Sequence, residues 1–168
     1  YQASETMTCV TCHDPHLPTE MARTLARESC SQCHEPMDCG EHVRLPKPLQ
    51  SKCVDCHMPY EYVNNITFDL ADDQYVPIIQ RHDHRIAVNP EASDLTQLRW
   101  LESQADDESQ QQAAGLRQKL MEQKRKEADE YEAEDRFIAA AGVLRELLLL
   151  EEDEAAKSRL EFLLRTRR

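Results

Sequence analysis

Three pentapeptides near the start of the chain repeat one pattern, Cys-x-x-Cys-His: CVTCH at 9–13, CSQCH at 30–34 and CVDCH at 53–57. A single copy could arise by chance, or as a zinc or redox cysteine pair that happens to precede a histidine. Three copies within the first 57 residues leave little room for chance. This spacing is the attachment signature of c-type haem.

In that interpretation, the two thiols of each motif add across the vinyl groups of one porphyrin, and the next imidazole is the proximal ligand of the iron. The rival interpretation is a zinc-ribbon array, in which cysteine pairs combine two at a time around one metal. A zinc ribbon does not require histidine directly after each pair, so the sequence predicts three haem c groups. The thiols are those of Cys9, Cys12, Cys30, Cys33, Cys53 and Cys56, and the proximal imidazoles those of His13, His34 and His57.

Composition agrees with a chain built around cofactors. Its 168 residues allow one or two small domains, and three glycines and nine aromatic residues are a small supply for a core made of protein alone. Haem macrocycles would supply the missing apolar bulk. The net charge of −12 argues against nucleic-acid binding and favours a basic or neutral redox partner.

The predicted compartment follows from the cofactor. Covalent haem is loaded outside the cytoplasm, so we expect a periplasmic or extracellular (secreted) protein. No signal peptide or membrane span is visible, and a chain that begins at Tyr1 suits a processed form or a fragment. Six haem thiols leave Cys39, which we expect to be a free buried thiol. An intermolecular disulfide or thioether contact is the alternative.

The two halves of the chain differ in composition. All cysteines, histidines and prolines lie at or before Pro90, and the rest is rich in Ala, Glu, Gln, Leu, Lys and Arg, which favours helices. We therefore predict a mainly α fold. It has a loop-rich, haem-packed cytochrome domain over 1–90, with each motif on a short helical turn, and a helical segment over 91–168.

The helical segment is predicted to contain about three helices, separated by polar stretches and by a break at 151–154. Their apolar positions are Leu95, Leu98, Trp100, Leu101, Leu116, Leu120, Phe137, Ala140, Leu144, Leu147, Leu148, Leu160, Leu163 and Leu164. The acidic residues at 151–154 are placed to favour the start of the last helix. We expect these residues and the basic run at 124–126 to be solvated helix surfaces.

The second axial ligand decides whether a haem iron transfers electrons or does chemistry. The histidines outside the motifs are His16, His42, His82 and His84. They suffice for bis-histidine coordination of three irons, with one to spare. His16 is too close to His13 to reach the same iron, so we expect it to serve a neighbouring haem. The competing methionine ligands are Met7, Met21, Met37 and Met58.

The segment Arg81-His-Asp-His-Arg85 offers two imidazoles for one site. In an extended chain they lie on the same face, and Asp83 between them would orient one ring as a hydrogen-bond acceptor. We prefer His84 as the ligand and keep His82 as the alternative.

In this order along the chain, CVTCHDPH at 9–16, CSQCH at 30–34, Glu41-His42, CVDCHMP at 53–59 and RHDHRI at 81–86 resemble the multihaem cytochrome c domains that precede tetratricopeptide repeats in some bacterial secreted proteins. The resemblance covers residues 7–90. It implies that His16, His42 and His84 are the distal ligands, that all three irons are six-coordinate, and that the activity is electron transfer. His82 departs from the pattern.

The C-terminal part is similar to the second half of a tetratricopeptide repeat over 133–153. Phe137, Ala140, Leu144 and Leu147 would be its packing positions. Asp135 stands where glycine is common, and Glu152 where proline is common. The alternative is an ordinary amphipathic helical hairpin.

Together these features predict an electron carrier in which electrons hop along a short haem chain between an external donor and acceptor. The helical tail would dock to a partner or to copies of itself, as one unit of a longer conduit or filament. One rival is a multihaem oxidoreductase with one open iron for nitrite, hydroxylamine or sulfite. Another is a haem-stabilised scaffold whose helices bind partners.

Overall fold

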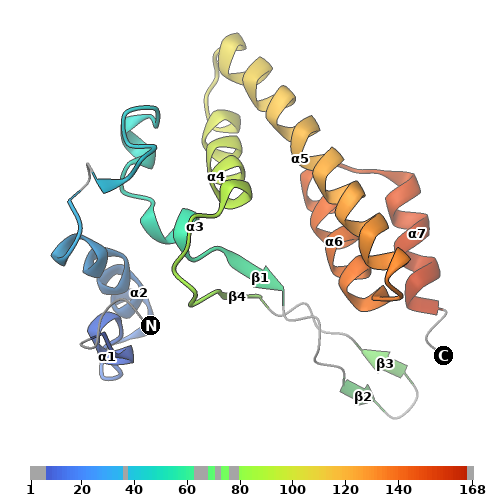
Figure 1. The fold of residues 1–168 in the computed structure, drawn as a ribbon, viewed down its shortest axis with the longest axis horizontal. Helices are drawn as coiled ribbons and strands as arrows, with labels where there is room; N and C mark the ends of the chain where they lie inside the picture. Colours follow the sequence, from blue (N-terminus) through green and yellow to red (C-terminus); the bar gives the residue numbers. More distant parts are fainter. Residues whose placement is uncertain (1–6, 36–37, 63–67, 71–72, 76–79, 166–168) are drawn as a thin grey trace.

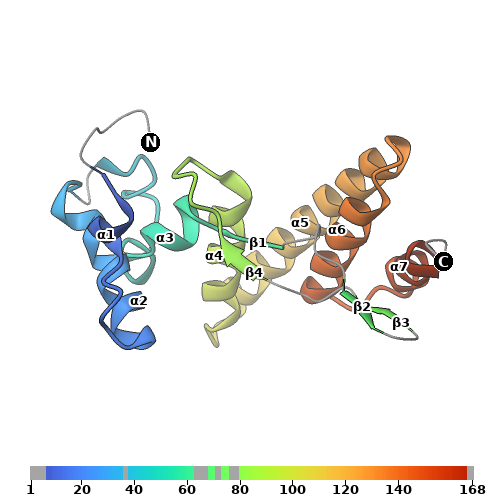
Figure 2. The same ribbon diagram turned by 90° about the horizontal axis from the view of Figure 1, so that it is seen from below.

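The computed structural model describes residues 7–35, 38–62, 68–70, 73–75 and 80–165. The protein is mainly helical, which confirms the predicted fold class at that level. Short helical elements lie at one end of an elongated molecule and long helices at the other, with two small hairpins between them in the sequence (Figures 1 and 2).

The N-terminal elements are short. They are α1 (Cys9–Cys12), α2 (Thr19–Glu28), the 3-10 turns η1 (Ser29–Gln32) and η3 (Lys47–Leu49), and α3 (Cys53–His57). Each motif thus lies on a helical turn, as predicted. Among the side chains described between residues 7 and 60, Leu49 is the only buried hydrophobic one, and Val43 is 85% exposed. The described part of residues 7–60 therefore has almost no apolar core of its own.

Two antiparallel hairpins follow α3, in a part where the sequence suggested only loops and short helices. Strand β1 (Tyr60–Tyr62) pairs with β4 (Gln80–His82), so that Tyr60 lies opposite His82, and β2 (Phe68–Leu70) pairs with β3 (Asp73–Tyr75). After β4 the chain returns along α3. There Asp83 N donates to Pro59 O at 2.9 Å, and Ala87 N donates to His57 O at 3.2 Å.

Four long helices complete the chain: α4 (Pro90–Glu102), α5 (Asp107–Ala133), α6 (Phe137–Leu150) and α7 (Glu154–Arg165). Helix α4 begins where Asn89 Oδ1 accepts a hydrogen bond from Ala92 N at 3.0 Å, with proline at the first helical position. The connections are short, so consecutive helices pack as antiparallel neighbours (Figure 1).

The apolar core divides between two clusters that share α5. The first joins α4 to the N-terminal half of α5, and its buried members are Leu98, Leu101, Ala113 and Leu120. The second joins the C-terminal half of α5 to α6 and α7, and its buried members are Met121, Ala128, Ala140, Ala141, Val143, Leu144, Leu147, Ala156 and Leu163. A helix of 27 residues is long enough to serve both clusters.

Two residues that were predicted to pack in the core are instead exposed, so the prediction is wrong for them. Phe137 is 41% exposed because it is the first residue of α6, at the end of the packed face. Leu164 is 38% exposed, while its neighbour Leu163 turns toward α6 and is buried. One helical position rotates a side chain by about 100°, which is enough to move it out of a packed face.

Lys124 was expected on a solvated surface but is buried, with 5% of the residue exposed. Its Nζ lies 2.5 Å from Glu91 Oε1 on α4 and 2.5 Å from Glu146 Oε2 on α6. Burial by itself lowers the pKa of the ammonium, but Glu146 and Glu91 outweigh that effect and raise the pKa above its ordinary value. Burial also raises the pKa of the Glu146 carboxyl. Lys124 therefore connects three helices where the two clusters meet.

The third motif is packed directly against the helical half, since both α3 and η3 contact α4. Among the helices of the described residues, none combines the length and the apolar character that crossing a lipid bilayer requires.

Candidate functional site

The first motif begins with a hydrogen-bonded cap. Thr8 N donates to Thr11 Oγ1 at 3.0 Å, and His13 N donates to Cys9 O at 2.9 Å. Cys9 and Cys12 are three positions apart on this single turn, so their side chains leave the same face. His13 follows with an extended backbone and an exposed side chain.

The second motif continues from α2 through η1. Cys33 N and His34 N both donate to Cys30 O, at 3.3 and 3.0 Å, which winds the motif into a tight turn. His34 Nδ1 lies 3.8 Å from Asp38 Oδ2, and both side chains are mostly exposed. The turn again brings two thiols and an imidazole together.

The third motif forms the whole of α3, and its imidazole is oriented by the backbone. His57 Nδ1 lies 2.9 Å from Ala87 O. Because a carbonyl oxygen only accepts hydrogen bonds, Nδ1 carries the proton, and the lone pair of Nε2 is free to bind a metal. Ligating histidines commonly have this arrangement, in which the second nitrogen donates to a carbonyl or carboxylate.

Cys30 of the second motif lies within electrostatic range of a cysteine from each of the other two motifs. Burial raises the pKa of the Cys30 thiol, and the nearby Cys53 and Cys12 raise it further. Among the described residues, no three His, Cys, Asp or Glu side chains are grouped as ligands of a single metal ion.

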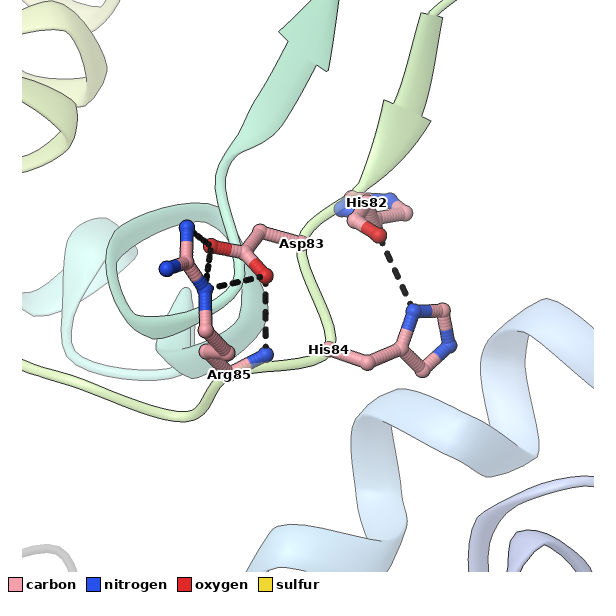
Figure 3. A network of polar contacts seen from close by, with 4 residues as sticks. All are labelled: His82, Asp83, His84 and Arg85. Carbon is pink, nitrogen blue, oxygen red and sulfur yellow. Dashed lines mark hydrogen bonds and ion pairs between the residues drawn. The ribbon is translucent and has the colours of Figure 1, made fainter. Parts of the chain in front are cut away.

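The last residue of β4 and the turn after it carry two imidazoles in different surroundings (Figure 3). His82 is half-buried, its Nδ1 lies 2.6 Å from Met58 O, and its ring stacks on Tyr60 with centroids 3.9 Å apart. His84 is exposed, and its Nδ1 lies 3.0 Å from His82 O. Backbone carbonyls therefore leave Nε2 free on both rings.

Asp83 has a different role from the one predicted. Its carboxylate does not contact either ring through a described hydrogen bond but accepts from Arg85, at 2.9 Å from the backbone N and 3.1 Å from Nε (Figure 3). Hydrogen bonds from Arg85 hold the pKa of Asp83 below its ordinary value. The Asp83–Arg85 pair thus closes the turn that carries His84.

His84 lies beside the first motif. Its ring centroid is 6.0 Å from that of His13, and the two planes are inclined by 45°. The tertiary structure has brought together a predicted proximal ligand and a predicted distal ligand from distant parts of the sequence.

The other two predicted distal ligands, His42 and His16, have backbone groups that are hydrogen-bonded to nearby residues. His42 is half-buried; its N donates to Cys39 O at 2.9 Å, and its O accepts from Gln50 Nε2 at 2.9 Å. His16 is exposed, and its N donates to Asp14 Oδ1 at 2.9 Å. Cys39 is a free, half-buried thiol. Met37 lies outside the described residues.

These residues fit haem c in their chemistry and surroundings. Each motif presents two free thiols and an adjacent imidazole on a helical turn, and none of these thiols is fully buried. The described side chains of residues 7–60 include exposed apolar ones such as Val10 and Met21 and one buried hydrophobic, Leu49, so they offer apolar surface that macrocycles would cover. No protein-family model, curated protein or solved structure matches this chain.

Proposed function

We propose that this protein is an electron carrier that binds three haem c groups through its Cys-x-x-Cys-His motifs. The observation that carries the proposal is the set of three turns that each present two thiols and an imidazole, with Cys12 and Cys53 both within electrostatic range of Cys30. Each bound iron would accept one electron from a donor as it becomes ferrous and return it to an acceptor as it becomes ferric.

The chain's own groups divide into three roles. The thiols hold each cofactor at two points, and His13, His34 and His57 bind the irons from the proximal side. The distal ligands are His16, His42 and His84, with His82 as the alternative. The competing methionine ligand nearest to a motif is Met58, which is half-buried and directly follows the third motif at the end of α3.

Fixed imidazoles suit electron transfer better than substrate chemistry. His57, His82 and His84 each donate Nδ1–H to a backbone carbonyl, so their orientation is set before any metal binds. A preset ligand rearranges little when the iron changes charge. With two imidazoles on every iron, no position is left for a substrate, which favours a carrier over a nitrite- or hydroxylamine-type enzyme.

The net charge of the protein and its helical half indicate which kinds of partner it would bind. The net charge of −12 favours a basic or neutral redox partner. Helices α4 to α7 form a separately packed body next to the motifs, which suits docking to a partner or to neighbouring copies in a conduit or filament. Covalent haem implies a periplasmic or extracellular location.

The test is to produce the full chain in a host that attaches haem c, and to measure intact mass and iron spin state. We expect the mass of three haems, loss of one haem in the Cys30→Ser/Cys33→Ser variant, and no loss in the control Cys39→Ser. Ferric iron should be wholly low-spin, and a reductive titration should fill all three haems. A protein without covalent haem would contradict the proposal, and a high-spin iron in the unsubstituted protein would favour the enzyme.

A further inference from the structure

We infer that His13 and His84 bind the same iron. The segment after β4 would thus supply the second axial ligand of the haem attached at Cys9 and Cys12. This pairing rests on the proposed function. It goes beyond it by assigning one distal ligand to one haem and by deciding between His82 and His84.

The separation of the two rings carries the inference. Metal–imidazole bonds are about 2 Å long, and the centre of each ring lies about 1 Å beyond the bound nitrogen, so two imidazoles on opposite faces of one iron have centroids on the order of 6 Å apart. The His13 and His84 centroids are 6.0 Å apart. A tilted pair of rings in simple contact has a similar separation, and the experiment below distinguishes the two.

The surroundings of His84 leave its ring free to bind a metal. Its Nδ1 donates to His82 O at 3.0 Å, which leaves the Nε2 lone pair available. The turn that carries it is closed by Asp83, which accepts from Arg85 N at 2.9 Å and pairs with the guanidinium at 3.0 Å (Figure 3). The ring itself is exposed, so no packed neighbour has to move when a ligand bond forms.

His82 is committed to the hairpin instead. Its ring stacks on Tyr60, directly opposite it in the β1–β4 register, and its Nδ1 is only 2.6 Å from Met58 O. Moving this ring to an iron would break the stack and the hydrogen bond together. We assign His82 to holding the hairpin that positions His84.

The pairing also ties the two ends of the N-terminal half. A bond from each ring to one iron closes a loop from His13 to His84, which contains the second and third motifs and both hairpins. Cross-links that close long loops stabilise a fold by restricting the unfolded chain. The segment that follows His84 leads directly into α4, so the first haem would be mechanically coupled to the helical half.

The test uses His84→Ala in the full haem-loaded chain, with His82→Phe as the matched control, because phenylalanine keeps a ring to stack on Tyr60 but has no nitrogen that could bind iron. We expect His84→Ala to retain three haems by mass, while one of three ferric irons becomes high-spin and one of three ferrous irons binds carbon monoxide. Added imidazole should restore the low-spin state. The control should leave all three irons low-spin.

A second step identifies the iron. In a Cys9→Ser/Cys12→Ser background, which keeps two haems, His84→Ala should produce no high-spin iron. NMR of the reduced unsubstituted protein, which is diamagnetic, gives the same assignment without substitution, through contacts between His84 ring protons and the haem on Cys9 and Cys12.

Three results would overturn the pairing: only low-spin iron in His84→Ala, a high-spin iron in His82→Phe, or contacts of His84 with another haem. Each leaves three covalent haems in place and so differs from failure of the proposed function, in which the unsubstituted protein lacks them.

Discussion

Lys124 shows how much one side chain contributes to this molecule. Its ammonium is surrounded by Glu91, Glu127 and Glu146, which belong to three helices. A buried amine with such partners is stabilised as a charge, whereas the carboxylates left without it would be partly buried and would repel one another. The position therefore tolerates neither an apolar replacement nor loss of charge.

We predict that Lys124→Met lowers the free energy of unfolding by about 2–3 kcal/mol, because the partners stay partly exposed and the loss falls below that of a fully buried pair. The control Lys126→Met, at a largely exposed position, should change it by less than about 0.5 kcal/mol. Urea unfolding followed by circular dichroism measures both. Equal effects of the two substitutions would show that burial of Lys124 contributes nothing.

At the scale of elements, the start of α7 is stabilised by a charge that depends on pH. Asp153 Oδ1 accepts from Ala156 N at 2.9 Å, and Oδ2 pairs with Arg125 on α5 at 2.8 Å. These hydrogen bonds, first that from Arg125, lower the pKa of the carboxyl below its ordinary value. A carboxyl with a depressed folded-state pKa stabilises the fold above its unfolded-state pKa, and the contribution disappears as the pH falls through the folded-state pKa.

We therefore predict that the Asp153→Asn substitution, which keeps an oxygen to cap α7, flattens the dependence of stability on pH below about pH 4. The measurement is urea unfolding of both proteins at a series of acidic pH values. Glu154→Gln, one residue later and exposed, is the control and should keep the slope of the unsubstituted protein. A slope unchanged in Asp153→Asn would refute the role of this pair.

At the scale of the whole molecule, the two halves are stabilised differently. Helices α4 to α7 bury two apolar clusters, whereas Leu49 is the one buried hydrophobic among the described side chains of residues 7–60. Burying apolar surface is the main favourable term in folding, so the N-terminal half depends on whatever else it packs against. In the proposed function, that is haem.

Removing the cofactor should thus affect the halves unequally. We predict that the chain produced without haem attachment keeps slow amide exchange in α5 and α6 and exchanges rapidly over residues 7–60, while the haem-loaded chain protects both. Hydrogen exchange with mass spectrometry gives this comparison directly. Equal protection of residues 7–60 in both forms would show that the N-terminal half folds without haem.

Local sequence determined much of this protein. The motif spacing places two thiols and an imidazole on each turn. Asn89 and Pro90 mark the start of α4, and Asp135, which stands where glycine is common, has a left-handed backbone with φ of 57°. These features depend on interactions between residues a few positions apart, so pattern and spacing suffice to predict them.

Only the tertiary structure decided that Lys124 is buried, that a β hairpin carries His82, and that His84 lies beside His13. Each of these depends on which elements pack together across long stretches of chain. A basic residue in a charged helix looks solvated until two other helices supply carboxylates. Two histidines in one pentapeptide look equivalent until one stacks in a hairpin and the other reaches the first motif. Sequence spacing reports neighbours along the chain, and only neighbours in space distinguish His84 from His82.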